Sequence, residues 1–72
     1  MKVLIADPIS KLGLSILSDS GFDLIIKAGS SLDEKLSAVQ DVDGIIIRSG
    51  TKVDYKMLQI AENLKVIGRA GV

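Results

Sequence analysis

The sequence lacks two residue types that often carry chemistry, cysteine and histidine. Without cysteine the chain can form neither a disulfide framework nor a thiolate metal site. Without histidine it has neither the commonest general base nor the commonest zinc ligand, so no metal site is predicted. Nine acidic residues balance nine basic ones. This balance gives no indication of a nucleic acid or an anionic membrane as a partner.

Long apolar segments are also missing. The apolar run at residues 3–6 ends at Asp7. It is too short for a signal peptide or a membrane span, so a cytoplasmic location is expected. The 72 residues suffice for one small domain, which buries about 60% of its unfolded surface. An apolar fraction of 47% with 25% charged residues is typical of a globular domain rather than a disordered segment.

Several enzyme motifs are absent. The sequence contains no G-x-G-x-x-G, no P-loop and no H-E-x-x-H, and residues 68–71 give only the weak pattern G-x-x-G. A phospho-receiver domain is the main alternative for this rhythm of strands and helices. It needs an acidic pair after its first strand and an aspartate after its third. This chain has a single acidic residue, Asp7, after the first strand and an arginine, Arg48, after the third. Both differences argue against a receiver domain.

Four short apolar runs alternate with three helical patterns. The runs lie at residues 3–6, 22–26, 45–47 and 66–67. Strands that are apolar on both faces and alternate with helices predict a parallel sheet covered on both sides. The sequence therefore predicts an α/β fold in the order β-α-β-α-β-α-β, with right-handed crossovers. Because no helix follows the last strand to cover it, the chain is expected to be part of a larger domain.

The first helix is predicted from its boundary residues. Asp7 is the expected N-cap, with Pro8 at the first helical position, and Ser20-Gly21 supplies the end. A catalytic role for Asp7 is the alternative. The residues expected to face the core are Ile9, Leu12, Ile16 and Leu17.

The second and third helices are predicted in the same way. Ser31 and Glu34 have the spacing of a capping box, and Asp54 is the expected cap of the third helix, which ends at Asn63. Tyr55 is expected to be a half-buried packing residue. The residues expected to face the core are Leu32, Leu36 and Val39 in the second helix and Met57, Leu58 and Ala61 in the third.

The only two arginines, Arg48 and Arg69, each follow an apolar run directly. In open parallel sheets, ligands bind beyond the carboxyl ends of the strands, so two guanidinium groups are predicted over one cleft. A guanidinium matches the geometry of a carboxylate or a phosphate and keeps its charge. The predicted ligand is small and anionic. The structural alternative is that Arg48 pairs with a neighbouring acid such as Asp7 or Asp43.

Three segments, residues 2–10, 43–53 and 63–72, resemble the D-isomer-specific 2-hydroxyacid dehydrogenases, in particular members with a phosphorylated substrate. The most specific runs are R-S-x-T-K-V and N-L-K-V-I-G-R-A-G-V, and Gly50 stands where the family often has alanine. The resemblance implies that residues 1–72 are the N-terminal part of a flavodoxin-like substrate-binding domain. It also implies strand order 2-1-3-4, helices on both faces, and a nucleotide-binding Rossmann domain outside this chain.

The resemblance further implies roles for individual residues. The implied substrate-binding residues are Arg48, Ser49, Arg69, Ala70 and Gly71, and Val72 is the implied contact with the cofactor NAD. The full-length enzyme would be a homo-oligomer that oxidises a small phosphorylated 2-hydroxy acid, and this segment would hold none of its catalytic residues. Two alternatives stay open. One is another D-2-hydroxyacid dehydrogenase, similar to glyoxylate or hydroxypyruvate reductases, and the other is a stand-alone α/β domain that binds an anion or a partner without catalysis.

Overall fold

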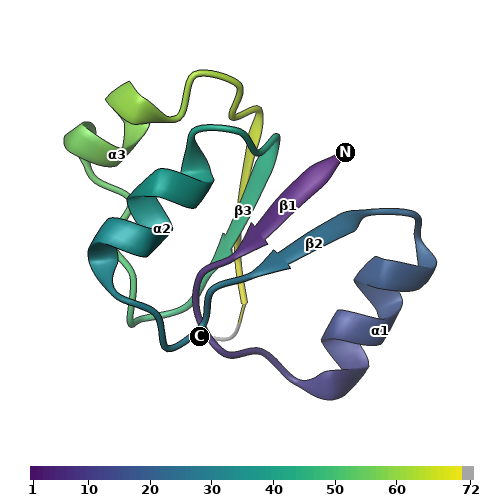
Figure 1. Ribbon diagram of the computed structural model, residues 1–72. Helices are drawn as coiled ribbons and strands as arrows, with labels where there is room; N and C mark the ends of the chain where they lie inside the picture. Colours follow the sequence, from purple (N-terminus) through teal and green to yellow (C-terminus); the bar gives the residue numbers. More distant parts are fainter. Residues whose placement is uncertain (71–72) are drawn as a thin grey trace.

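The structure, a computed structural model, describes residues 1–70. The strands are β1 (Lys2–Ile5), β2 (Asp23–Ile26), β3 (Gly44–Ile47) and β4 (Val66–Arg69), and the helices are α1 (Lys11–Asp19), α2 (Leu32–Val39) and α3 (Tyr55–Ile60) (Figure 1). This is the predicted alternation of strands and helices. None of these helices in the described part of the chain has the length and apolar character needed to cross a membrane.

The four strands form one parallel sheet in the order β2-β1-β3-β4, which confirms the expected topology. Leu4 in the central strand β1 pairs with Ile25 of β2 and with Ile45 of β3. In Figure 1, α1 lies on one side of the sheet, while α2 and α3 lie together on the other. The α/β class with helices on both faces is therefore confirmed.

The main core lies between the sheet and the layer formed by α2 and α3. Its buried members are Leu4, Ala6, Val39, Val42, Ile45, Met57 and Ala61. Because side chains alternate along a strand, the neighbours Val3 and Ile5 point to the opposite face, and they are buried too. Strand β1 is thus buried on both faces, as its continuous apolar run indicates.

Helix α1 begins later than predicted. Ser10, and not Asp7, is the N-cap: its hydroxyl oxygen accepts a hydrogen bond from the Gly13 amide at 3.0 Å. Pro8 therefore lies in the connection before the helix. The prediction was wrong because the Asp7 carboxylate binds a distant loop instead. The predicted end of the helix is confirmed, since Gly21 has φ +90°, a conformation that glycine adopts without strain.

The predicted caps of the other two helices are confirmed. The Ser31 hydroxyl accepts a hydrogen bond from the Glu34 amide at 3.2 Å, and the Asp54 carboxylate accepts one from the Met57 amide at 3.0 Å. Helix α3 is shorter than expected, because the backbone leaves the helical conformation at Ala61, before Asn63.

Several residues predicted to be buried are exposed. Leu12 and Ile16 of α1 are 71% and 57% exposed, Leu32 is 60% exposed, and Leu58 is 47% exposed. Tyr55, expected to be half-buried, is 76% exposed. A helical stripe of apolar residues shows which side of a helix faces inward. How far each residue is covered depends on where the short helix lies over the sheet, which the stripe does not determine.

Candidate functional site

The carboxyl ends of the four parallel strands lie at the same edge of the sheet. Asp7 lies just beyond β1, Arg48 follows β3, and Arg69 is the last residue of β4. The strand order places β1, β3 and β4 next to one another, so the carboxyl ends of these three strands lie side by side. The fourth strand, β2, lies on the other side of β1. Lys27, which follows β2, borders a different cavity together with Ile25.

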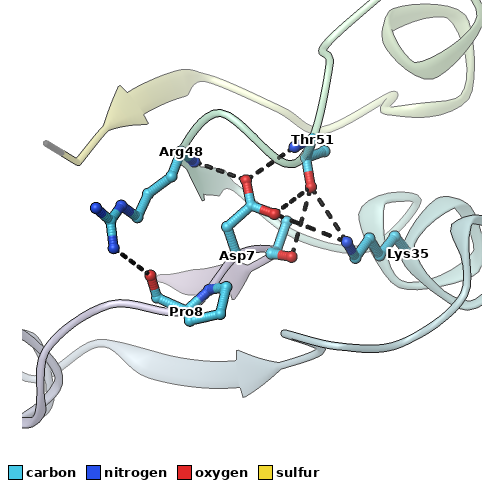
Figure 2. A network of polar contacts seen from close by, with 6 residues as sticks. Asp7, Pro8, Lys35, Arg48 and Thr51 are labelled. Atoms are coloured by element: carbon cyan, nitrogen blue, oxygen red, sulfur yellow. Dashed lines mark hydrogen bonds and ion pairs between the residues drawn. The ribbon is translucent and has the colours of Figure 1, made fainter. Parts of the chain in front are cut away.

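Asp7 is the centre of a polar network at this edge (Figure 2). Its side chain is almost completely buried, with the residue 3% exposed. Oδ2 accepts hydrogen bonds from the backbone amides of Arg48 at 2.7 Å and Thr51 at 3.0 Å. Oδ1 accepts one from the Thr51 hydroxyl at 2.7 Å, and the Lys35 ammonium lies 3.8 Å away. The carboxylate therefore joins the connection after β1 to the loop after β3 and to α2.

These partners keep Asp7 ionised. Burial by itself would raise the pKa of the Asp7 carboxyl, because it removes water from the charged form. The hydrogen bonds from the Arg48 amide and from the hydroxyl and amide of Thr51, with the charge of Lys35, outweigh that effect. The pKa of Asp7 is lowered below its ordinary value of 3.8, so the group is an anion at neutral pH and accepts hydrogen bonds only.

The lowered pKa of Asp7 predicts a contribution to stability that acid removes. A carboxyl with a lower pKa in the folded state stabilises the fold above its unfolded pKa of about 3.9, and this contribution is lost as the pH falls through the folded pKa. Asp7→Asn removes the titrating group. We expect the difference in free energy of unfolding between wild type and Asp7→Asn to shrink as the pH falls from about 6 to about 2.5.

Urea unfolding at a series of pH values measures this difference. The matched control is Asp19→Asn, which removes an exposed carboxyl at the end of α1. This control removes one carboxylate and leaves the hydrogen bonds around Asp7 in place. A constant difference for Asp7→Asn over the same range would contradict the prediction.

Arg48 and Arg69 leave the edge of the sheet in different directions. The Arg48 guanidinium donates a hydrogen bond to the Pro8 carbonyl at 3.4 Å, and Figure 2 shows the side chain running toward Pro8 and away from Thr51. Arg69 pairs in register with Ile47, whose side chain packs against the core on the α2–α3 face. Paired residues of a parallel sheet project to the same face, so Arg69 starts on that face.

Both arginines nevertheless border one open cavity of about 490 Å³. Its lining residues are Ile47, Arg48, Ser49, Thr51, Lys52, Val53, Asp54 and Arg69. Among residues 1–70, neither guanidinium forms an ion pair with a carboxylate. The structural alternative for Arg48 was therefore wrong. Asp7 binds the Arg48 amide rather than its guanidinium, and Asp43 lies at the other end of β3, where it binds Lys2 and Lys65.

The remaining predicted site residues have different positions. Ser49 borders the cavity with the two arginines. Ala70 borders a second cavity of about 490 Å³ on the α1 side, with Arg48 and Ile46. The Ala70 amide donates to the Ile47 carbonyl at 2.8 Å, so it is already used within the sheet. Gly71 and Val72 lie outside the described residues, and their roles stay predictions.

Sequence reasoning missed the partners of Asp7. Thr51 and Lys35 are separated from Asp7 by many residues, and Thr51 is buried although it lies in a loop after glycine. Neither residue belongs to a periodic pattern or a motif. The only local signal was that Asp7 ends an apolar run, which indicates a capping residue as readily as a partner in a distant contact.

The described residues do not form a dinucleotide site. Such sites place the pyrophosphate on a glycine-rich turn between the first strand and its helix. Residues 6–10 join β1 to α1 without a glycine, and the buried anion of Asp7 lies within this connection. A negative charge at this position opposes a pyrophosphate. The NAD that the resemblance implies therefore does not fit this turn, as expected if the nucleotide-binding domain lies outside this chain.

Comparison with known proteins gives one consistent result. The sequence profile for the catalytic domain of D-isomer specific 2-hydroxyacid dehydrogenases matches residues 3–72. A D-3-phosphoglycerate dehydrogenase of Archaeoglobus fulgidus is 44% identical over 72 residues, which cover all of this chain and 14% of that protein. The human D-3-phosphoglycerate dehydrogenase is 41% identical over 70 residues, which cover 97% of this chain and 13% of that protein.

A solved structure agrees with these sequence relatives. The crystal structure of NAD+-bound 3-phosphoglycerate dehydrogenase from Entamoeba histolytica matches with a TM-score of 0.83 at 25% identity. The match covers 100% of this chain and 26% of that one. The chain thus spans a small part of the proteins that it resembles.

Proposed function

Because the chain belongs to the D-isomer specific 2-hydroxyacid dehydrogenase family, we propose that it supplies part of the substrate site of an NAD-dependent dehydrogenase. The reaction is the oxidation of 3-phosphoglycerate to 3-phosphohydroxypyruvate, which opens L-serine synthesis. Relatives that carry the name D-3-phosphoglycerate dehydrogenase support this choice. Residues 1–72 are the N-terminal part of the substrate-binding domain, and the Rossmann domain that binds most of the NAD is a different part of the enzyme.

The observation that carries the proposal is the pair of arginines at one cavity. Arg48 and Arg69 border it together with Ser49, and no carboxylate of residues 1–70 forms an ion pair with either guanidinium. Two arginines that border one cavity, from the ends of neighbouring strands, suit a substrate with a carboxylate at one end and a phosphate at the other. We call Arg48, Ser49 and Arg69 the anion clamp. Arg48 and Ser49 hold one anionic end, and Arg69 supplies the second cation.

The same cavity favours a phosphorylated substrate over a simple 2-hydroxy acid. A monoanionic acid, as used by enzymes similar to glyoxylate or hydroxypyruvate reductase, needs one guanidinium. Such a substrate offers no second anionic group to the other arginine that borders the cavity. The homo-oligomeric state, the cytoplasmic location and the part that Ala70, Gly71 and Val72 play beside the nicotinamide stay predictions.

The proposal is tested by the kinetics of the full-length enzyme. Initial rates of NADH formation are compared for 3-phosphoglycerate and D-glycerate, which differ only in the phosphate. We expect kcat/KM to be at least about tenfold higher for 3-phosphoglycerate, since a charge-assisted hydrogen bond contributes about 1.5–3 kcal/mol. Equal values would favour a dehydrogenase for non-phosphorylated acids, and no oxidation of either acid would contradict the proposal as a whole.

A further inference from the structure

The loop that carries two members of the anion clamp is held by a residue outside it. Arg48 and Ser49 begin the connection from β3 to α3. Both lie on a short loop that has no helix or strand of its own. The loop is anchored at the Arg48 amide and at the Thr51 amide, and a single oxygen, Oδ2 of Asp7, accepts both hydrogen bonds. Ser49 and Gly50 are the two residues between the anchored amides in the chain.

Arg48 is held at its side chain as well as at its amide. Asp7 accepts from the amide at 2.7 Å, and the carbonyl of the next residue, Pro8, accepts from the guanidinium at 3.4 Å (Figure 2). Proline restricts the backbone at this point, because its ring fixes φ. The short connection after β1 therefore contacts both ends of the Arg48 residue.

Asp7 is itself fixed from the opposite side. Its Oδ1 accepts a hydrogen bond from the Thr51 hydroxyl and faces the Lys35 ammonium of α2. The Lys35 side chain is only 12% exposed, and its ammonium also donates to the Thr51 hydroxyl oxygen at 3.2 Å. A carboxylate with this many partners in a buried position cannot turn to another rotamer without leaving polar groups unpaired.

The loop approaches the Asp7 carboxylate most closely at Gly50. A Cβ added to Gly50 would lie 2.8 Å from Oδ1 of Asp7, closer than real carbon atoms come to such an oxygen. Because Asp7 has several hydrogen-bond partners, a side chain at position 50 would require either the loop to shift or these hydrogen bonds to change. The loop can close on the carboxylate in this chain because residue 50 has no side chain.

We propose that Asp7 is a positioning residue for the anion clamp: its carboxylate sets the conformation of segment 48–51 and thereby directs Arg48 and Ser49 toward the substrate. The inference rests on the proposed function, since the clamp is assigned there. Asp7 does not touch the substrate itself. It acts through the two backbone amides that it binds.

The test uses the full-length enzyme with 3-phosphoglycerate as substrate. Asp7→Ala removes both amide anchors and should raise KM at least about tenfold, the loss expected when hydrogen bonds to a charged group are removed. The value of kcat should change much less, because the clamp holds the anionic end of the substrate. Asp7→Asn keeps a side-chain oxygen that can accept hydrogen bonds from the two amides. The KM of this variant should therefore lie within about twofold of the wild-type KM.

A matched control separates positioning from general stability. Val39→Ala creates a cavity in the core under α2, where Val39 is completely buried, and removes none of the hydrogen bonds that hold the loop. It should destabilise the fold and leave KM unchanged. If Val39→Ala raises KM as much as Asp7→Ala, or if Asp7→Ala leaves KM unchanged, the inference is overturned. Should Asp7→Ala fail to fold, Asp7→Glu gives the same readout, since it keeps a charge for Lys35 but displaces the oxygens by one methylene.

A second measurement distinguishes a failure of the proposed function from a failure of the inference about Asp7. If the wild-type enzyme does not oxidise 3-phosphoglycerate, the clamp assignment fails, and amide hydrogen exchange of segment 48–51 decides the role of Asp7 in the same full-length protein. Asp7→Ala should then speed exchange at Arg48 and Thr51 at least about tenfold, while Val39→Ala should not do so selectively. Unchanged exchange at these two amides would overturn the inference.

Discussion

Replacing Arg69 with leucine in the full-length enzyme is expected to raise KM for 3-phosphoglycerate about 10- to 150-fold, because one charge-assisted hydrogen bond contributes about 1.5–3 kcal/mol. Arg69 is exposed at the end of β4 and borders the same cavity as Arg48. Among the described residues its guanidinium forms no ion pair. It is therefore available to a ligand, and leucine removes the charge while it keeps much of the apolar stem.

The effect should depend on the phosphate. The loss in kcat/KM for D-glycerate, measured by the same rates of NADH formation, should be much smaller than the loss for 3-phosphoglycerate. Lys65→Leu is the matched control, because it removes a positive charge just before the same strand, at the opposite edge of the sheet. We expect it to leave both substrates within about twofold of the wild type, as exposed substitutions away from a site do. Equal losses for the two substrates in Arg69→Leu would remove the argument for a phosphate.

Replacing Leu4 with alanine is expected to lower the free energy of unfolding by about 2–5 kcal/mol, the range measured for buried leucines. Leu4 is 0% exposed in the central strand β1, and it packs in the core with Ile45 and Met57. Native proteins have about 5–15 kcal/mol of total stability, so the loss would be a large part of it. Urea unfolding followed by circular dichroism measures the change.

Leu12→Ala is the control for this substitution. It makes the same chemical change in α1, at a residue that is 71% exposed. The free energy of unfolding should change by less than about 0.5 kcal/mol, as is usual for exposed positions. A similar loss at both positions would show that α1 is packed more closely than the structure has it.

Local patterns in the sequence were enough to predict the elements and their order. The apolar runs, the caps at Ser31 and Asp54, and the glycine after α1 depend on neighbours a few residues apart, so they can be read along the chain. The alternation of strands with helices then required a parallel sheet. The strand order came from the family resemblance and was confirmed by the structure. Because parallel strands end at the same edge, the position of Arg48 and Arg69 at one end of the sheet was also predictable.

The organisation of that end of the sheet depends on long-range contacts. Asp7 binds amides 41 and 44 residues away, and contacts at this separation leave no periodic trace in the sequence. For the same reason the first helix has Ser10 as its cap, since the Asp7 carboxylate is already used. The register of β3 with β4 sets the face from which Arg69 leaves the sheet.

The amino-acid order thus specifies the α/β class, the alternation of elements and the two arginines at the carboxyl edge of the sheet. Folding in three dimensions specifies which partner each polar group takes and which apolar residues are covered. The two kinds of information differ because secondary structure follows from local sterics and periodic burial. The partner of a buried carboxylate is instead chosen by whichever donors the folded chain brings within hydrogen-bonding distance.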